Sequence, residues 1–517
     1  MDGFDGAVVR VGLLGVFIAA SLCRTRWSAL DRRFGALVGV LVAVGLLAYV
    51  GNARVHPRAG RIHIHHPDVY HYYIGAKYFA ELGQAGLYEA TVIADFEDDR
   101  RRFRPLMTIR DLRDSAREIP RKAVLKRRAE IAGRFSSVRW RDFKSDLAFF
   151  RRVDPERWHA SEIQRDHGYN GTPLTTAVLG ALANWSPGGT AAFLAAAVWF
   201  DLVLVLATGA CIGILLGGYA GLVFLFFWFA NPLNDYDFIG GAFLRYNYFI
   251  AIALGIAFYR RGFLVASGVG FAAASLFRIF PVIFPFALLG YDVLHPARRQ
   301  RLHRNRALYA VTAVTAGLLL VATSFVSTPE GTNPWLEQIE AVSSRNALQA
   351  PNGVSLRFPF LYRAEHNVSA VLAAATRGET LDWLAATNRT FEARRPYYYA
   401  ALGALVLISV VFARRSADVE AFFLGIVAMF AVLIVSHYYF CLLALVPLMF
   451  REDRRVAELL AAGMVAVILT GWLPAVRETL DLRYVVVSLV VLVTLVAILA
   501  LRLWNPRQDG AEPELFA

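Results

Sequence analysis

Cysteine and lysine are scarce in this chain of 517 residues, and each scarcity excludes something. The three cysteines lie in or beside apolar runs and lack the spacing of metal ligands, so we expect neither a disulfide framework nor a zinc site. Lysine occurs only at positions 77, 122, 126 and 144, and all other basic residues are arginines. We interpret this bias as an effect of genomic base composition, which favours a GC-rich bacterial source.

Signatures of nucleotide and nucleic-acid binding are also missing. The chain has neither a Walker loop nor a GxGxxG fingerprint after a predicted strand, and it lacks the cytoplasmic domain that a nucleotide-sugar enzyme would need. The net charge of +13 is carried mainly by loops that flank apolar runs, where the positive-inside rule and anionic lipid headgroups account for it. We therefore expect membrane lipids, and no nucleic acid, as partners.

Long apolar runs dominate what is present. Hydrophobic residues make up 57% of the chain, above the range of soluble globular domains. The sequence predicts an all-α polytopic membrane protein with about 13 transmembrane helices and a large extracytoplasmic loop after the second, because its apolar runs are long enough to cross a hydrocarbon core, for which about 20 residues are needed. The candidate spans are 7–23, 34–51, 190–217, 219–232, 238–259, 263–277, 279–292, 307–325, 397–413, 419–436, 438–450, 456–473 and 484–502.

The arginine-rich loops between these spans predict the topology. By the positive-inside rule they are cytoplasmic, which puts the N-terminus outside and the C-terminus inside a bacterial inner membrane. In residues 52–172 we expect amphipathic helices that lie on the lipid headgroups. The predicted organisation is 1–51 as N-terminal helices, 52–172 as an extracytoplasmic loop with the candidate site, 173–325 as a transmembrane core, 326–396 as a second extracytoplasmic loop and 397–517 as C-terminal helices.

Residues 263–292 are predicted to form a hairpin of two short spans, because basic loops flank them on both sides. The break falls at residues 276–281, where Pro281 cannot donate a backbone hydrogen bond and Arg278 is unsuited to lipid tails. A guanidinium at the outer end of such a hairpin can bind a phosphate through two parallel hydrogen bonds. Anchoring to headgroups, or pairing with a carboxylate, is the alternative role for Arg278.

Histidines, tyrosines and one carboxylate gather in residues 63–79, shortly after the second predicted span. Asp68, Tyr72 and Gly75 share a helical face at three- and four-residue spacing, a stripe suited to an acceptor hydroxyl and a sugar ring. Asp68 is the candidate general base. The alternative is that it caps a helix within an interfacial aromatic belt. The histidines could bind a divalent metal, but no ligand scaffold supports one and no cofactor is required.

The string from Asp68 to Phe79, closing with Gly86-Leu-Tyr88, resembles the first extracytoplasmic loop of the glycosyltransferase C superfamily. Among these multi-pass membrane glycosyltransferases it is closest to the polyprenyl-phosphomannose-dependent mannosyltransferases. The resemblance implies that Asp68, just after a transmembrane exit, is the catalytic base. It also implies a polyprenyl-phosphate sugar donor and a lipid or glycan acceptor.

Further matches follow in the family's order along the chain. Residues 169–174 are similar to its Tyr-x-Pro-Pro turn, residues 278–281 to its Lys-x-x-Pro, residues 352–356 to its Asn-Gln-Ser-Leu and residues 436–439 to its late histidine-bearing turn. Residues 95–167 look like an insertion. The substrate-binding residues that these matches imply are His71, Tyr72, Asn247, Arg278, Asn352, His437 and Tyr438.

The hypothesis is inverting transfer of mannose, or of another hexose or pentose, on the extracytoplasmic face. Asp235 and Asp237 are second-choice carboxylates on that side. The main rival is a transporter or flippase of lipid-linked saccharides, but few ionisable residues other than Asp201 and Arg278 lie away from the ends of the candidate spans. A third hypothesis is a non-catalytic scaffold protein of an envelope complex, but it assigns no function to the polar residues around Asp68.

Overall fold

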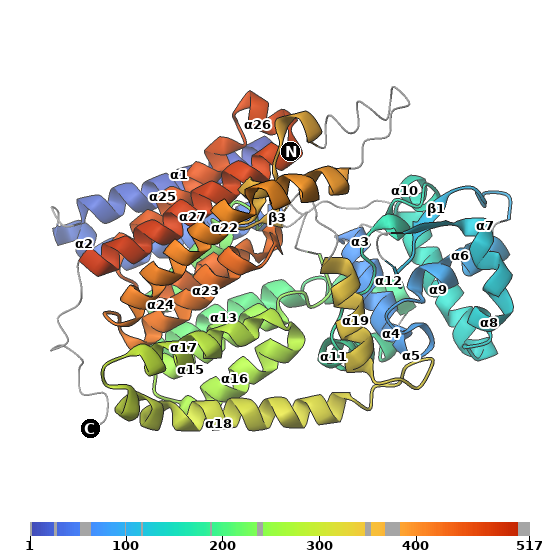
Figure 1. Cartoon of the computed structure of the whole chain (residues 1–517), viewed down its shortest axis with the longest axis horizontal. Helices are drawn as coiled ribbons and strands as arrows, with labels where there is room; N and C mark the ends of the chain where they lie inside the picture. Colours follow the sequence, from blue (N-terminus) through green and yellow to red (C-terminus); the bar gives the residue numbers. More distant parts are fainter. Residues whose placement is uncertain are drawn as a thin grey trace.

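A bundle of long helices and a globular domain at one end of it make up the protein (Figure 1). The computed structural model describes residues 3–24, 28–51, 64–98, 100–114, 117–186, 189–234, 241–346, 353–367 and 383–504. Within these ranges the chain is mainly helical, and its strands form two short antiparallel pairs. The all-α class predicted from the sequence is confirmed.

The bundle occupies the left and centre of the view in Figure 1. Its elements are α1 (Gly3–Cys23), α2 (Ser28–Gly51), α13 (Phe200–Leu216), α14 (Gly218–Phe229), α15 (Asn247–Arg260), α16 (Leu264–Phe277), η5 (Phe280–Val282), α17 (Ile283–Leu294), α18 (Arg298–Thr323), α22 (Trp383–Ala413), η7 (Asp418–Glu420), α23 (Ala421–Val432), η8 (His437–Leu445), α24 (Val446–Met449), α25 (Arg454–Thr470), α26 (Pro474–Glu478) and α27 (Leu480–Trp504). Helix α12 (Gly189–Ala197), which precedes α13, packs on α9 in the core of the globular domain (Figure 1).

Six of the described helical segments are long and apolar enough to cross a membrane. They are 6–23, 33–51, 189–216, 298–323, 385–413 and 480–504, and five shorter apolar helices accompany them. Every one of the thirteen predicted spans overlaps a helix of the bundle, but the shorter helices do not by themselves establish a crossing. The protein is thus built as a membrane protein, and the number of thirteen spans stays a prediction.

The globular domain is formed mostly by residues 64–184. It has its own hydrophobic core, in which Tyr70, Phe143, Phe150 and Trp158 are fully buried. Its elements are α3 (His66–Val69), the π-helix η2 (Tyr70–Ile74), α4 (Gly75–Lys77), α5 (Phe79–Leu82), α6 (Leu87–Asp98), β1 (Thr108–Arg110), β2 (Glu118–Pro120), α7 (Arg121–Val124), η3 (Leu125–Arg127), α8 (Arg128–Ala132), α9 (Ser137–Val153), α10 (Pro155–His159), η4 (Ile163–Arg165) and α11 (Pro173–Asn184).

The amphipathic helices expected to lie on the headgroups are part of this domain instead. The apolar face of α9 packs on α6 and η2. Its aromatic residues are therefore buried in a protein core, where they are removed from water without contact with lipid. The charged residues are paired around this core. The buried Asp95 carboxylate lies 2.8 Å from the Arg121 guanidinium and 3.4 Å from that of Arg151, which offsets the cost of its burial.

The bundle and the globular domain are joined at the break between α16 and α17. Helix α16 ends at Phe277, and Arg278 has extended backbone angles. The hydroxyl of Thr172, the N-cap of α11, donates to the carbonyl oxygen of Leu276 at 2.5 Å, and that of Thr175 donates to Phe277 at 3.0 Å. The start of α11 therefore satisfies carbonyls that the end of α16 leaves without helical partners. Arg278 is consequently held against the globular domain.

The second loop also returns to this end of the bundle. It contains α19 (Pro334–Asn346), β3 (Gly353–Val354), α20 (Phe358–Leu361) and η6 (Ala364–His366). Strand β3 pairs antiparallel with β4 (Val435–Ser436), directly before η8. The backbone N–H of Leu356 donates to the carbonyl oxygen of Phe430 at 2.8 Å. The loop thus fixes the backbone from which η8 begins.

Ion pairs hold the opposite end of the bundle together. Arg260 at the end of α15 lies 2.5 Å from Glu452, Arg502 of α27 lies 2.5 Å from Glu420, and Arg301 pairs with Asp418. These residues belong to, or lie beside, the arginine-rich loops for which the sequence predicts a cytoplasmic position. In the structure they gather at one end of the bundle, away from the globular domain (Figure 1).

Candidate active site

Asp68 lies in the first turn of α3, where the globular domain meets the bundle. Its carboxylate accepts a hydrogen bond of 2.8 Å from Nδ1 of His65 and forms an ion pair with Arg245. The side chain is 15% exposed. The backbone N–H of His65 donates to the carbonyl oxygen of Gly241 at 2.9 Å, which ties this turn to the loop before α15. Asp68 is thus a partly accessible carboxylate with a charged partner from another part of the chain.

Arg245 was not among the residues that the sequence singled out. It follows Leu244, whose backbone has a φ of 50°, an uncommon conformation for a residue with a side chain. The buried carboxylate of Asp201 accepts the backbone N–H groups of Arg245 at 2.9 Å and Tyr246 at 3.0 Å. Asp201 therefore shapes the loop that presents Arg245 to Asp68. The one available signal was a lone arginine beside aromatic residues within the predicted span 238–259.

Arg278 lies at the same end of the bundle as Asp68. One guanidinium nitrogen donates to the hydroxyl of Tyr72 at 2.5 Å, and another donates to the side-chain oxygen of Asn170 at 3.2 Å. The Tyr72 hydroxyl in turn donates to Asn170. Tyr72 belongs to the π-helix η2, an uncommon element that is frequently found at functional sites. The globular domain thus supplies both hydrogen-bond partners of the Arg278 side chain.

Tyr438 connects the two arginines. The Arg245 guanidinium lies 4.1 Å from the centre of its ring, a cation–π distance. Tyr438 also interacts electrostatically with Arg278. Tyr439 packs beside Tyr438, with ring centres 4.6 Å apart, and Phe280 packs on Tyr439 at 4.9 Å. The start of η8 therefore lies between the loop that carries Arg245 and the break that carries Arg278.

We call these five residues the junction cluster: Asp68, Tyr72, Arg245, Arg278 and Tyr438. Two guanidinium groups and one carboxylate give the cluster an excess of positive charge. Phenol groups supply hydrogen bonds and ring faces beside those charges. Such a set can hold an anionic group with the arginines while a carboxylate accepts a proton next to it.

The other predicted residues are not all in the cluster. His71 is buried in the globular domain, where its Nε2 is 2.8 Å from the Tyr88 hydroxyl and its Nδ1 is 3.9 Å from Asp166. Asn247 is two residues from Arg245; its Oδ1 accepts the backbone N–H of Tyr248 at 2.7 Å, and its buried Nδ2 has no hydrogen-bond partner within the described part of the chain. Outside the described residues lie Asn352, Asp235, Asp237, His63 and the side chain of His437.

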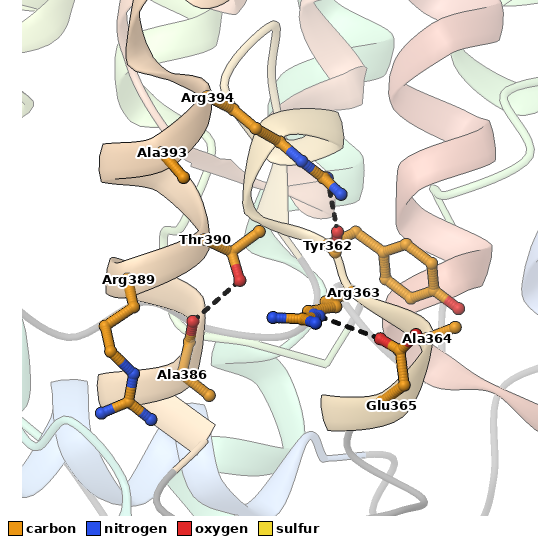
Figure 2. A pocket seen from close by; sticks show the side chains of 9 residues that line it. All are labelled: Tyr362, Arg363, Ala364, Glu365, Ala386, Arg389, Thr390, Ala393 and Arg394. Atoms are coloured by element: carbon orange, nitrogen blue, oxygen red, sulfur yellow. Dashed lines mark hydrogen bonds and ion pairs between the residues drawn. The ribbon is translucent and has the colours of Figure 1, made fainter.

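A cavity of about 630 Å³ lies elsewhere at this end of the bundle, between the first turns of α22 and residues 362–365 (Figure 2). A second, smaller hollow is apolar and lies between η8, α25 and α27. Neither of the two is lined by the junction cluster.

Within the described ranges, no group of three or more histidine, cysteine, aspartate or glutamate side chains is arranged to hold a metal ion. Comparisons of the chain with protein-family models, with curated proteins and with solved structures give no match.

Proposed function

We propose that the protein is a membrane glycosyltransferase that transfers a sugar from a polyprenyl-phosphate donor to an extracytoplasmic acceptor with inversion. The observation that supports this most is the meeting of Asp68 with Arg245 and, through Tyr438, with Arg278 at one end of the bundle. The proposed face is the one that carries the globular domain, and the proposed location is a bacterial inner membrane.

The two arginines fit the phosphate of such a donor. A sugar phosphodiester carries one negative charge, and the lipid phosphate that leaves carries more. A guanidinium already in place, such as that of Arg278, therefore stabilises the leaving group more than the bound donor, which is the condition for catalysis, whereas Arg245 contributes mainly to binding the donor phosphate. Arg278 is oriented by Tyr72 and Asn170, so little order is lost when it binds.

Asp68 fits the role of general base. It would take the proton of the acceptor hydroxyl as the hydroxyl oxygen bonds to the anomeric carbon, while the bond from that carbon to the phosphate oxygen breaks and its electron pair leaves with the lipid phosphate. In the structure the Asp68 carboxylate is engaged by Arg245. A donor phosphate competes for the same guanidinium, so donor binding would release the carboxylate for the acceptor.

Transfer of labelled sugar by the purified protein in liposomes tests the proposal. A polyprenyl-phosphate hexose is the donor, and Asp68→Asn is compared with Asp98→Asn, a control on α6 outside the cluster. We expect Asp68→Asn to lower the rate about a hundredfold or more and Asp98→Asn to leave it near that of the wild type.

The same liposomes distinguish the carrier from the enzyme. Translocation of an intact lipid-linked saccharide without transfer would contradict the proposal and favour the transporter or flippase. Wild-type transfer by a folded Asp68→Asn variant would remove Asp68 from the mechanism.

A further inference from the structure

The cavity beside α22 is lined mainly by arginine and small residues. Arg389 and Arg394 come from α22, and Arg363 from the segment facing it. The space between the two segments arises because the facing positions are small, namely Ala364, Ala386, Thr390 and Ala393. Its volume of about 630 Å³ is within the range of small-molecule sites.

The charge of this cavity is positive. Among the described residues that line it, the one carboxylate is that of Glu365, which lies 3.0 Å from the Arg363 guanidinium. Arg394 is held in place by a hydrogen bond of 2.8 Å to the carbonyl oxygen of Tyr362. Arg389 forms no ion pair with any described residue, and its side chain is exposed. Figure 2 shows the Arg363 guanidinium between α22 and the Tyr362–Glu365 segment.

The cavity lies at the level expected for lipid headgroups. Tyr397 and Tyr399, just below it on α22, are 70% and 50% exposed, as in the aromatic belt at a membrane surface. Further along the same helix, Val406 and Leu407 are exposed apolar residues, suited to lipid tails. Arg394 is three residues before Tyr397, which is roughly 4.5 Å along the helix axis. The N-terminal end of α22 projects toward the globular-domain side in Figure 1.

We propose that this cavity binds the phosphate headgroup of a lipid from the membrane leaflet on the globular-domain side. Arg394 and Arg363, whose guanidinium groups face the space between the two segments (Figure 2), hold the phosphate oxygens, as guanidinium groups do through paired hydrogen bonds, and the exposed Arg389 adds positive charge at the edge. The acyl chains lie along the apolar face of α22 below the tyrosines. This site is separate from the junction cluster, and the proposal stands whether or not the protein transfers a sugar.

Native mass spectrometry of the full chain in a neutral maltoside detergent tests the proposal. Phosphatidylglycerol is titrated against wild type, Arg394→Gln, Arg363→Gln and Arg395→Gln. Arg395 is the matched control, because it is next to Arg394 on the same helix but does not line the cavity. We expect affinity to fall about tenfold for each cavity variant and to stay unchanged for Arg395→Gln. Asp68→Asn should bind the lipid like the wild type.

Two comparison ligands decide what is recognised. Diacylglycerol has the same tails without the phosphate and should bind much more weakly. Inorganic phosphate at the same concentration should not displace phosphatidylglycerol. An equal loss in Arg395→Gln would show mere attraction to a basic surface and overturn the proposal. Equal binding of diacylglycerol, or displacement by inorganic phosphate, would also overturn it.

Discussion

The Arg245 guanidinium lies 4.1 Å from the centre of the Tyr438 ring, while the same side chain forms an ion pair with Asp68. Its position depends on Asp201, which accepts two backbone N–H groups of the loop. Three segments far apart in the sequence therefore meet at one side chain. Arg245 is therefore positioned either to pair with the Asp68 carboxylate or to bind the phosphate of a donor, and substitution of Arg245 distinguishes these two roles.

Arg245→Gln is expected to weaken donor binding more than it slows the chemical step. Glutamine keeps hydrogen-bonding capacity but loses the charge that attracts a phosphate. We expect the KM for the lipid donor to rise about tenfold and kcat to change less, because Asp68 is then released from its ion pair. Steady-state transfer measured over a range of donor concentrations gives both values. A fall in kcat at unchanged KM would instead assign Arg245 to the transition state alone.

Tyr72→Phe is expected to reduce transfer without unfolding the domain. The variant keeps the ring but removes the hydroxyl that accepts a hydrogen bond from Arg278 at 2.5 Å. Arg278 then loses one of two groups that orient it, so we expect a reduction of about tenfold. Tyr484→Phe, on α27 and outside the cluster, is the matched control. Equal rates in Tyr72→Phe and the wild type would mean that the orientation of Arg278 does not limit transfer.

Gly75→Ala is expected to destabilise the globular domain. A Cβ atom at position 75 would lie 2.6 Å from the Tyr169 ring, which is fully buried and hydrogen-bonded to Thr176. The ring cannot move aside, so we expect a loss of about 1–3 kcal/mol. At Gly317 of α18 a Cβ meets nothing within 4 Å, so Gly317→Ala is the control. Thermal unfolding followed by near-ultraviolet circular dichroism compares the two, and equal midpoints would contradict the prediction.

Glu97→Gln is expected to lower stability at neutral pH but not in acid. Burial by itself would raise the pKa of the Glu97 carboxyl, but hydrogen bonds from Trp140, Arg128 and Lys144 outweigh it and lower the pKa below its ordinary value of 4.5. A carboxylate whose pKa is lowered by folding stabilises the fold above its unfolded-state pKa, and this contribution is lost as the pH falls through the folded-state value.

Melting temperatures of wild type and Glu97→Gln should therefore differ by a few degrees at pH 7 and converge well below pH 4.5. Glu162→Gln is the control, because Glu162 pairs with Arg157 at an exposed position where an ion pair contributes little. A difference that persists unchanged in acid would show that packing, and not charge, accounts for the effect.

Much of this arrangement followed from periodicity and charge. Apolar runs predicted the helices of the bundle, and Pro281 together with Arg278 predicted the break that ends α16. Asp68, singled out as a carboxylate among tyrosines, lies in the first turn of α3 where the globular domain meets the bundle, and its role as the base stays a prediction. These features depend on residues close together in sequence, where local physics decides the outcome.

The features that sequence reasoning missed depend on distant contacts or unusual backbone. His71 was assigned to substrate binding from the family resemblance, but in the structure its side chain is buried in the domain core against Tyr88. Arg245 is one arginine among many, and its role requires both the Leu244 turn and the Asp201 carboxylate. The core of the insertion depends on α6, α9 and η2 packing together.

The β3–β4 pair has a consequence for how the protein could be controlled. Ser436, the last residue of β4, is separated from Tyr438 by a single residue, and the pair is only two residues long. A strand pair this short contributes little stability and separates readily. Displacement of residues 353–354 from the bundle would remove a support of the backbone at the start of η8. The Tyr438 ring would then move away from the Arg245 guanidinium. The second loop is therefore positioned to influence the contact between Tyr438 and Arg245 from a distance in the sequence.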